Sequence, residues 1–334
     1  MSEKIKELTL EEQAEYLMNG CFEVLPEGKT ALISKLKKAQ EEKRPLRVKL
    51  GIDPTAKDLH LGHTVCLQVL KKFQKLGHLP VLIIGGFTAQ LGDPTGRNEA
   101  RPPLTNEQVA ENAQSFLEQF AKVLDLSKVE VVNNADWLQN LSLKEILHLA
   151  STTTVNQIIG KEAFGERLEA GHPLYVHEIF YPILQGYDSV KLKADIEIGG
   201  QDQRFNVLAG RSLQKIFQQT PQAILLMPLL IGLDGKRKMS KTFDNFIALK
   251  DSPEEMFGKT MSLPDELLLD WFSLVLAYSP KEISKIKLAI EDGENPKNYK
   301  VKLAKALIET YYDENLANKA EQDFIQKFSK KQIP

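Results

Sequence analysis

Segments with the spacing of β-strands alternate with segments of helical spacing from about residue 46 to residue 246. Near the start of this region, apolar side chains occupy every second position, the period of a strand, at Leu46, Val48, Leu50 and Ile52. A helical repeat covers residues 65–73, and Pro80–Gly86 is then apolar throughout, as a strand covered on both faces would be. Strands that alternate with helices form parallel pairs with crossover helices, so the pattern predicts an α/β fold with a doubly wound parallel sheet.

The two flanks of this region differ from it in pattern. Residues 1–45 predict an N-terminal helical segment, because apolar residues recur at helical spacing at Leu8, Leu10, Ala14 and Leu17. Residues 247–334 lack strand patterns and predict a helical domain. Its first helix is marked by Ser252 as N-cap, followed by a proline and two acidic residues.

The composition is that of a globular chain, with 42% hydrophobic and 26% charged residues. The 43 basic and 45 acidic residues give a formal net charge of −2, so a nucleic-acid partner must be bound by local patches. Cys21 and Cys66 match no metal-ligand spacing and no disulfide framework, which indicates a reducing, cytoplasmic location. The chain has neither an apolar signal-peptide region nor a run of roughly 18 apolar residues, so we expect no membrane partner, and nothing points to DNA.

Two histidines follow the first predicted strand, in the segment His60-Leu61-Gly62-His63. In a doubly wound sheet, ligands bind at the carboxyl ends of the strands, where helix N-termini present free N–H groups to phosphates. Histidines three residues apart on a first helical turn point in the same direction, and Gly62 lets a nucleotide approach the backbone. Taken alone, two histidines satisfied within a turn explain the segment equally well.

A basic loop, placed at residues 236–246, follows the last predicted strand and contains Lys238-Met239-Ser240-Lys241-Thr242. Paired lysines on a glycine-flanked loop suit closure over a polyphosphate, where they neutralise the charge that develops on leaving pyrophosphate. On its own, such a run is more often a solvated surface loop. Together, the histidine pair and this loop form the paired motif of class I aminoacyl-tRNA synthetases; nucleotidyltransferases share only the first part and are usually shorter.

The resemblance extends to further segments. LGIDPTAKDLHLGH, GDPTGR, YPILQGYDS, GGQDQRFN and KMSKT occur in the order, and at about the spacings, found in bacterial tyrosyl-tRNA synthetases of the branch whose loop reads KMSK. The resemblance covers roughly residues 45–334 and implies a Rossmann-like catalytic domain over residues 46–246. It also implies a tyrosine–tRNA ligase, which forms tyrosyl-adenylate and pyrophosphate from L-tyrosine and ATP and then transfers tyrosine to the terminal ribose of tRNA(Tyr).

Three polar side chains lie at positions i, i+4 and i+7 of a predicted helix: Tyr181, Gln185 and Asp188. We expect this helix to begin at Pro182 and, because its other residues are apolar, to be buried with these groups facing inward. Buried polar groups need partners, and a bound tyrosine supplies them. The resemblance implies that Asp188 accepts the phenolic O–H and that the other tyrosine-binding residues are Asp53, Asp93, Tyr181, Gln185 and Gln203. Phenylalanine would leave Asp188 unpaired, a discrimination for which this family is the standard example.

For ATP, the resemblance implies that backbone approach and ribose contacts come from Gly51, Gly62, Gly199, Gly200 and Asp202. Thr55 and His60 would hold the phosphates and His63 the ribose side, while the pyrophosphate would be bound by Lys238, Lys241, Arg97 and Arg101. Mg²⁺ is expected on the phosphates, without a tightly bound protein metal site. No side chain need act as nucleophile or base, because the attacking carboxylate is already ionised.

Three positions depart from the better-known branch of this family, and one of them, Cys66, is expected to matter little. Lys49 stands where that branch has a tyrosine that shares the phenol contact, so a second partner of the phenol is not identifiable from the sequence. Arg97 replaces a lysine and keeps the charge with a different geometry.

Members of this family are two-fold homodimers joined through an insertion, here about residues 120–180. Its apolar pairs suit either an isologous interface or the core: Trp137-Leu138, Ile146-Leu147 and Ile158-Ile159. Members usually continue into a basic tRNA-binding module, which we expect to be absent here, with weakened binding of tRNA(Tyr). A tryptophan-specific synthetase and a non-catalytic paralogue remain as alternatives; the helix from Tyr181 to Asp188 favours tyrosine, and the intact histidine and lysine motifs favour catalysis.

Overall fold

A six-stranded sheet, in the order β1-β6-β5-β2-β3-β4, forms the framework of the protein. The strands are β1 (Glu23–Leu25), β2 (Arg47–Ile52), β3 (Leu79–Ile84), β4 (Glu130–Asn133), β5 (Ile196–Gly200) and β6 (Ala223–Met227). Neighbouring strands from β6 to β4 pair in parallel, whereas β1 pairs antiparallel with β6. The predicted α/β sheet is confirmed, and the structure adds one short antiparallel edge strand within residues 1–45, where only helices were expected.

The computed structural model describes residues 8–93, 104–160 and 162–329. The chain divides into two compact units. The first consists of Met1–Lys57, Val69–Phe116 and Asp125–Pro228, and the second of Asp58–Gln68, Leu117–Leu124 and Leu229–Pro334. The first unit therefore contains the whole sheet. None of the described helices is long and apolar enough to cross a membrane.

Strand β2 is the position at which the order of the sheet reverses. Val48 pairs with Pro80 of β3 on one side and with Ile196 of β5 on the other. In open parallel sheets, ligands bind outside the carboxyl ends of the strands at such a switch point. Asp53 directly follows β2, and Gly199 and Gly200 end β5, so the fold places predicted site residues at this edge.

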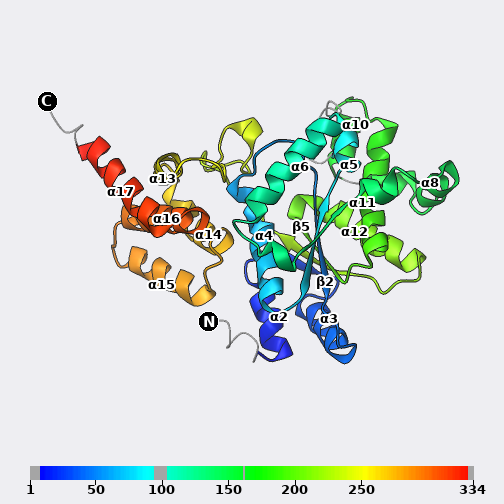
Figure 1. Cartoon of the computed structure of the whole chain (residues 1–334), viewed down its shortest axis with the longest axis horizontal. Helices are drawn as coiled ribbons and strands as arrows, with labels where there is room; N and C mark the ends of the chain where they lie inside the picture. Colours follow the sequence, from blue (N-terminus) through cyan, green and yellow to red (C-terminus); the bar gives the residue numbers. More distant parts are fainter. Residues whose placement is uncertain (1–7, 94–103, 161, 330–334) are drawn as a thin grey trace. The chain divides into compact units, whose positions relative to one another are not determined.

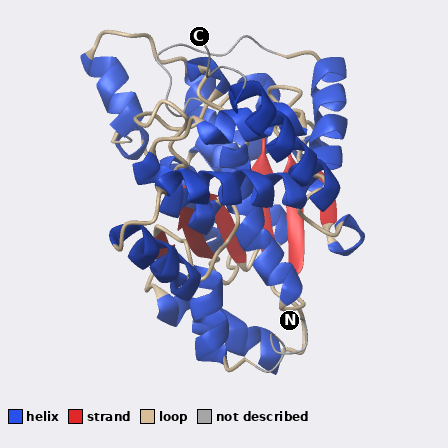
Figure 2. Cartoon of the chain, turned by 90° about the vertical axis from the view of Figure 1, so that its left-hand side faces the viewer, coloured by secondary structure: helices blue, strands red, loops and turns tan. Residues whose placement is uncertain are grey.

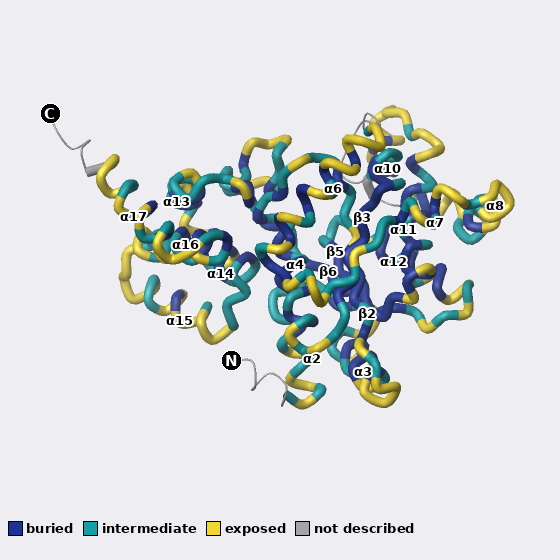
Figure 3. Tube along the Cα trace, in the orientation of Figure 1, coloured by how far each residue is buried: buried dark blue, intermediate teal, exposed yellow. Residues whose placement is uncertain are grey.

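Helices cover the sheet and fill the connections between its strands (Figures 1 and 2). They are α2 (Leu10–Met18), α3 (Lys29–Glu41), α4 (Leu61–Lys75), α5 (Thr88–Leu91), α6 (Asn106–Phe120), α7 (Ala135–Leu138), α8 (Leu143–Ala150), α9 (Val155–Ile159), α10 (Glu162–Glu169), α11 (Val176–Leu192) and α12 (Arg204–Ile216). The strands form the buried centre of the first unit, whereas α8 is largely exposed (Figure 3).

Helix α11 begins at Val176, so the predicted start at Pro182 was wrong. The carboxylate of Glu178 accepts a hydrogen bond from the backbone N–H of Tyr175 at 2.9 Å and caps the helix one and a half turns earlier. Arg167 holds that carboxylate through a buried ion pair of 2.7 Å. Pro182 lies inside the helix, which loses one backbone hydrogen bond there. Tyr181 and Asp188 are nevertheless buried, as predicted.

In the second unit, the chain after residue 247 forms helices α13 (Pro253–Met261), α14 (Leu268–Leu274), α15 (Pro280–Glu291), α16 (Pro296–Tyr311) and α17 (Glu314–Ser329). The predicted start at Ser252 is confirmed. Its hydroxyl accepts from the N–H of Glu255 at 3.2 Å, and the Glu255 carboxylate accepts from the N–H of Ser252 at 3.2 Å. These helices pack around apolar side chains that include Phe257, Trp271 and Phe272.

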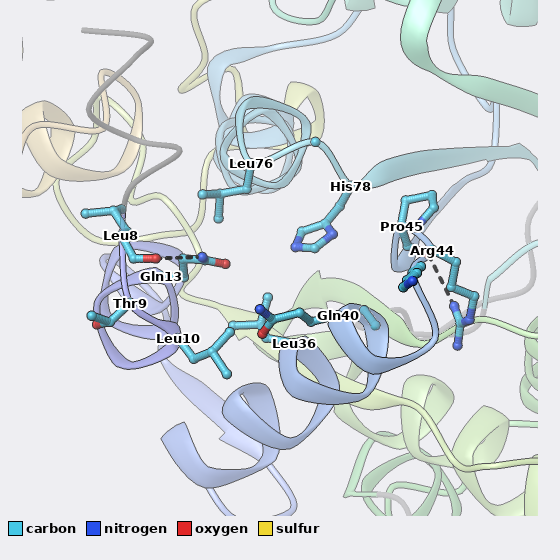
Figure 4. A pocket seen from close by; sticks show the side chains of 13 residues that line it. Leu8, Thr9, Leu10, Gln13, Leu36, Gln40, Arg44, Pro45, Leu76 and His78 are labelled. Atoms are coloured by element: carbon cyan, nitrogen blue, oxygen red, sulfur yellow. Dashed lines mark hydrogen bonds between the residues drawn. The ribbon is translucent and has the colours of Figure 1, made fainter.

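A cavity of about 610 Å³ lies beside the amino ends of β2 and β3 (Figure 4). Leu36 and Leu76 line it together with the polar side chains of Gln13, Gln40 and His78. It is at the opposite end of the strands from Asp53 and Gly200, and none of the predicted site residues in the described part of the chain lines it.

Candidate active site

Asp188 is the centre of a hydrogen-bonded cluster in the first unit. Its side chain is 3% exposed. The indole Nε1 of Trp137 donates to its Oδ1 at 2.9 Å, and the amide Nδ2 of Asn134 donates to its Oδ2 at 3.2 Å. Neither donor was predicted as a site residue. The only sequence indication was their position just after β4, at the same edge of the sheet as the other strand ends.

Asn134 and Thr88 connect Asp188 to Asp53. The same amide of Asn134 donates to the hydroxyl of Thr88 at 3.0 Å, and that hydroxyl donates to Oδ1 of Asp53 at 2.7 Å. Tyr181 donates its phenolic O–H to Oδ2 of Asp53 at 2.9 Å. The close packing requires glycine at position 85, because a Cβ there would collide with the Asp53 carboxylate and the Thr88 hydroxyl. Two predicted tyrosine-binding carboxylates thus belong to one network.

The environment of this cluster sets the protonation of its acids. Burial raises the pKa of Asp188 to about 6, against the opposing effects of Lys49 and of the hydrogen bonds from Trp137 and Asn134. Burial, followed by the charges of Asp53 and Asp93, raises the pKa of Tyr181 well above its usual value. At pH 7, Asp188 is therefore mainly an ionised acceptor and Tyr181 a protonated donor.

Lys49 is buried beneath this cluster and forms an ion pair of 2.8 Å with Glu197 of β5. Its ammonium group also donates to the backbone carbonyl of Gln185 at 3.0 Å. Lys49, for which the resemblance implied the place of a phenol-contacting tyrosine, is here part of a charged pair in the core. Gln185 itself is half-buried on α11.

A second group of predicted residues lies at the carboxyl ends of β2 and β5. Gln203 donates to Oδ2 of Asp93 at 2.8 Å and accepts from Asn206 at 2.8 Å. Gly51 faces open space, since a Cβ built on it meets nothing within 4 Å, which leaves room for a ligand against the backbone. Among the predicted nucleotide contacts, Thr55, Gly200 and Asp202 are partly exposed, whereas Gly199, near the end of β5, is buried.

Of the two predicted histidines, His60 directly precedes α4 and His63 lies in its first turn, both in the second unit. The backbone N–H of His60 donates to Nδ1 of His63 at 3.1 Å, and the ring centroids are 3.9 Å apart. Burial lowers the pKa of His63 to about 4 and that of His60 further, and the charges of Lys241 and Lys238 add to the effect on His60. Both rings are therefore neutral at pH 7. Within the described part of the chain, the buried Nδ1 of His60 has no hydrogen-bond partner.

The structure brings the histidine and lysine motifs together within this unit. The N–H of Leu61 donates to the carbonyl of Ile247 at 3.0 Å, and the N–H of Leu249 donates to the carbonyl of Leu59 at 2.9 Å. A Cβ on Gly62 would lie 3.6 Å from Cβ of Met239, so the first turn of α4 directly faces the lysine loop. The two motifs are 176 residues apart in the sequence, counted from Gly62 to Lys238. In the structure, they place neutral imidazoles beside a loop with two lysines.

Asn245 holds the lysine loop in shape. Its side-chain oxygen accepts from the N–H of Ser240 at 2.8 Å, and its amide donates to the carbonyls of Lys238 at 3.2 Å and Arg237 at 3.3 Å. A Cβ on Gly232 would collide with Asn245. Sequence reasoning missed this residue, because an asparagine in a polar loop resembles an ordinary turn residue.

Arg97 and Arg101, predicted near the pyrophosphate, lie outside the described residues. Among the residues that the structure describes, no group of three or more His, Cys, Asp or Glu side chains could hold a metal ion. Cys21 and Cys66 do not form a disulfide with each other.

Comparisons with known proteins identify the family. The model of the family described as "tRNA synthetases class I (W and Y)" matches residues 40–329. The tyrosine–tRNA ligase of Carboxydothermus hydrogenoformans is 49% identical over 326 residues, covering 97% of this chain and 79% of that protein. The tyrosine–tRNA ligase of Haemophilus influenzae is 48% identical over 318 residues, covering 95% of this chain and 78% of that protein.

Solved structures show the same fold. A C-terminally truncated mitochondrial tyrosyl-tRNA synthetase from Aspergillus nidulans superposes with a TM-score of 0.78 at 20% identity, covering 98% of this chain and 97% of that one. The tyrosyl-tRNA synthetase from Archaeoglobus fulgidus, in complex with L-tyrosine, gives 0.74 at 24% identity, covering 94% and 99%. The chain therefore belongs to the class I tRNA synthetases of the tryptophan and tyrosine group, and within it to the family of the bacterial tyrosine–tRNA ligases.

Proposed function

We propose that this protein activates L-tyrosine with ATP and transfers it to tRNA(Tyr). The observation that carries the choice of amino acid is Asp188, a buried carboxylate fixed by two neutral donors. A buried, ionised acceptor suits a phenolic O–H, and phenylalanine would leave it unpaired. An indole N–H also suits an acceptor, but the relatives of 46–49% identity are named for tyrosine, which favours tyrosine over tryptophan.

Asp188 would accept a hydrogen bond from the phenolic O–H of the substrate, while Trp137 and Asn134 keep the carboxylate oriented. The α-ammonium group of the substrate would be held by Asp93, Tyr181, Gln185 and Gln203, with Asp53 orienting Tyr181. Supporting this assignment, the Asp53 and Asp93 carboxylates already accept hydrogen bonds from Tyr181 and Gln203.

In the activation step, a carboxylate oxygen of tyrosine attacks the α-phosphorus of ATP, and the bond to the pyrophosphate oxygen breaks. Positioning and charge neutralisation suffice, because no proton has to be removed from the nucleophile. Lys238 and Lys241 would neutralise the leaving pyrophosphate, as would Arg97 and Arg101. The neutral imidazoles of His60 and His63 would donate hydrogen bonds to the nucleotide without charge of their own.

The remaining nucleotide contacts follow from the backbone. Gly51, Gly62, Gly199 and Gly200 would let the nucleotide lie against the chain, Asp202 would accept from ribose hydroxyls, and Thr55 would bind a phosphate. Mg²⁺ would accompany ATP, bound to the phosphate oxygens, which are the hard ligands that this ion prefers. When bound, it neutralises phosphate charge.

We further propose a catalytic domain over residues 46–246, preceded by the segment 1–45 and followed by the helical domain 247–334, in a cytoplasmic homodimer. Part of the proposed dimer region, residues 120–180, carries exposed apolar side chains: Leu143, Leu147, Val155 and Val176. Other apolar residues that were candidates for the interface, Leu138 and Ile158, are buried within the protomer. The interface therefore rests on fewer residues than the sequence suggested.

Amino-acid-dependent exchange of pyrophosphate into ATP, run with each of the twenty amino acids, tests this function. Exchange that depends on tyrosine, and far less on phenylalanine or tryptophan, is expected. Equal stimulation by tryptophan would overturn the specificity, and folded protein without any exchange would indicate a non-catalytic paralogue.

A further inference from the structure

Lys49 and Glu197 form an ion pair in the core of the first unit, each 1% exposed. The three N–H donors of the Lys49 ammonium have three acceptors: Oε1 of Glu197 at 2.8 Å, the hydroxyl of Ser189 at 2.7 Å and the carbonyl of Gln185 at 3.0 Å. The other carboxylate oxygen of Glu197 accepts from Ser189 at 3.1 Å and from the buried amide of Gln222. Every charged donor and both carboxylate oxygens are therefore satisfied.

The partners of this pair lie on either side of Asp188. Gln185 and Ser189 are the residues of α11 that precede and follow Asp188 within one helical turn, and both contact Lys49. The pair itself joins β2 to β5, the two strands of the switch point. It thus connects the helix turn that carries Asp188 to the centre of the sheet.

A buried ion pair is a poor means of stabilising a core. The cost of desolvating two charges roughly cancels their attraction, and apolar residues of similar volume are often as good or better. An ion pair that contacts the helix turn of the proposed phenol acceptor therefore suggests a role in binding at that acceptor.

We propose that Lys49 and Glu197 are positioning residues for tyrosine specificity: the pair fixes the α11 turn that carries Asp188, and its two opposite charges balance the electric field at that carboxylate. This inference rests on the proposed function, in which Asp188 must be ionised to accept the phenol.

The charges around Asp188 give the expected signs. Lys49 lowers its pKa, whereas Glu197 raises it, and Lys49 has the larger effect of the two. Trp137 and Asn134 face it as neutral donors. Tyr181 on the same helix is protonated, and the Asp53 and Asp93 carboxylates face Tyr181. Loss of the Lys49 charge should raise the pKa of Asp188 above about 6, and loss of the Glu197 charge should lower it.

The test uses Lys49→Met, Glu197→Gln and the double variant, with the dissociation constant of tyrosine measured from pH 5 to pH 8. At low pH, protonation of Asp188 should weaken tyrosine binding. This acid limb of the curve of affinity against pH should move to higher pH in Lys49→Met and to lower pH in Glu197→Gln. The double variant should lie between Lys49→Met and the wild type. For each pH unit that the limb moves, affinity on its acid side should change by about tenfold.

A matched control removes a different buried carboxylate, Glu178 of α11, the helix that carries Asp188. Glu178→Gln breaks the ion pair with Arg167 at the start of α11 and should leave the acid limb in place. If Lys49→Met does not fold, Glu197→Gln, which is nearly isosteric, still tests the sign.

Equal weakening of tyrosine binding by all variants at every pH would show a merely structural pair and overturn the inference. If Lys49→Met and Glu197→Gln fold and their acid limbs stay at the wild-type pH, the inference would also be overturned. Failure of the proposed function is distinguishable, because wild-type protein would then show no tyrosine-dependent exchange.

Discussion

The indole Nε1 of Trp137 lies 2.9 Å from Oδ1 of Asp188, and the two residues come from segments 51 positions apart in the sequence. The contact holds one lone pair of the acceptor in place before any substrate arrives. Asn134 holds the second oxygen, so the carboxylate has a fixed orientation. Because the Asp188 carboxylate is ordered before tyrosine binds, the free energy of binding is not reduced by the entropy cost of ordering it.

Trp137→Phe should reduce kcat/KM for tyrosine by roughly tenfold, because a hydrogen bond to a charged group contributes about 1.5–3 kcal/mol and part of it is retained through water. The ratio of tyrosine to phenylalanine should fall as well. Steady-state pyrophosphate exchange measures both. The other tryptophan, Trp271, donates to the carbonyl of Ile231 at 3.1 Å, so Trp271→Phe serves as the control and should leave the ratio unchanged. A Trp137→Phe variant with wild-type selectivity would contradict this role.

The raised pKa of Asp188 has a consequence for stability. Since the native carboxyl binds its proton more tightly than the unfolded one, the free energy of unfolding falls as pH rises from about 3.8 to about 6. The buried charge thus costs on the order of 3 kcal/mol at pH 7. Asp188→Asn should raise Tm at pH 7 and change it little at pH 4. Thermal unfolding of wild type and Asp188→Asn at the two pH values checks this. A substitution that lowers Tm at pH 7 more than at pH 4 would contradict the prediction.

Asn245→Ala should slow tyrosyl-adenylate formation by at least about tenfold while tyrosine affinity stays unchanged, because the side chain shapes the loop that carries Lys238 and Lys241. Single-turnover adenylate formation and equilibrium tyrosine binding separate the two effects. If Asn245 acts through the loop, its substitution should add little to Lys241→Ala. Asn295→Ala, which removes the cap of α16 in the same unit, is the control and should affect stability alone. Full additivity with Lys241→Ala would argue against a shared mechanism.

Leu147→Asp and Val176→Asp should weaken the proposed dimer, because they place charge on apolar side chains that are 59% and 70% exposed in the protomer. Light scattering at micromolar concentration should give a lower mass for these variants than for the wild type. Leu288→Asp changes a similarly exposed leucine (58%) in α15 and should leave the mass unchanged. A wild-type chain with the monomer mass would overturn the dimer itself.

The sequence predicted much of the sheet and the burial of Tyr181 and Asp188, for reasons visible in particular residues. Strands such as β6, which is buried throughout, have apolar patterns that local reasoning detects. The inward positions of Tyr181 and Asp188 follow from helical spacing and hold even though the helix starts earlier than Pro182 suggested. In contrast, Asn134 and Asn245 act through partners whose proximity depends on the tertiary fold. No local pattern distinguishes them from turn residues.

Lys49 shows the same limit in a strand. In the predicted strand, Lys49 is a polar residue that alternates with apolar ones, and this spacing does not identify a buried partner. Its burial depends on Glu197, 148 positions later by the difference of their numbers, and on the register that sets β2 beside β5. That register is a property of the folded sheet, so the pair emerged only from the structure.

The central claim, that Asp188 recognises the phenol of tyrosine, is tested most directly by the ratio of kcat/KM for tyrosine to that for phenylalanine. The ratio should be measured by pyrophosphate exchange in wild type and Asp188→Asn, with the KM for ATP as the internal control. We predict a large preference for tyrosine in wild type, a sharply reduced ratio in Asp188→Asn, and an unchanged KM for ATP. An Asp188→Asn variant that retains the wild-type ratio would show that another group recognises the phenol and would contradict the account.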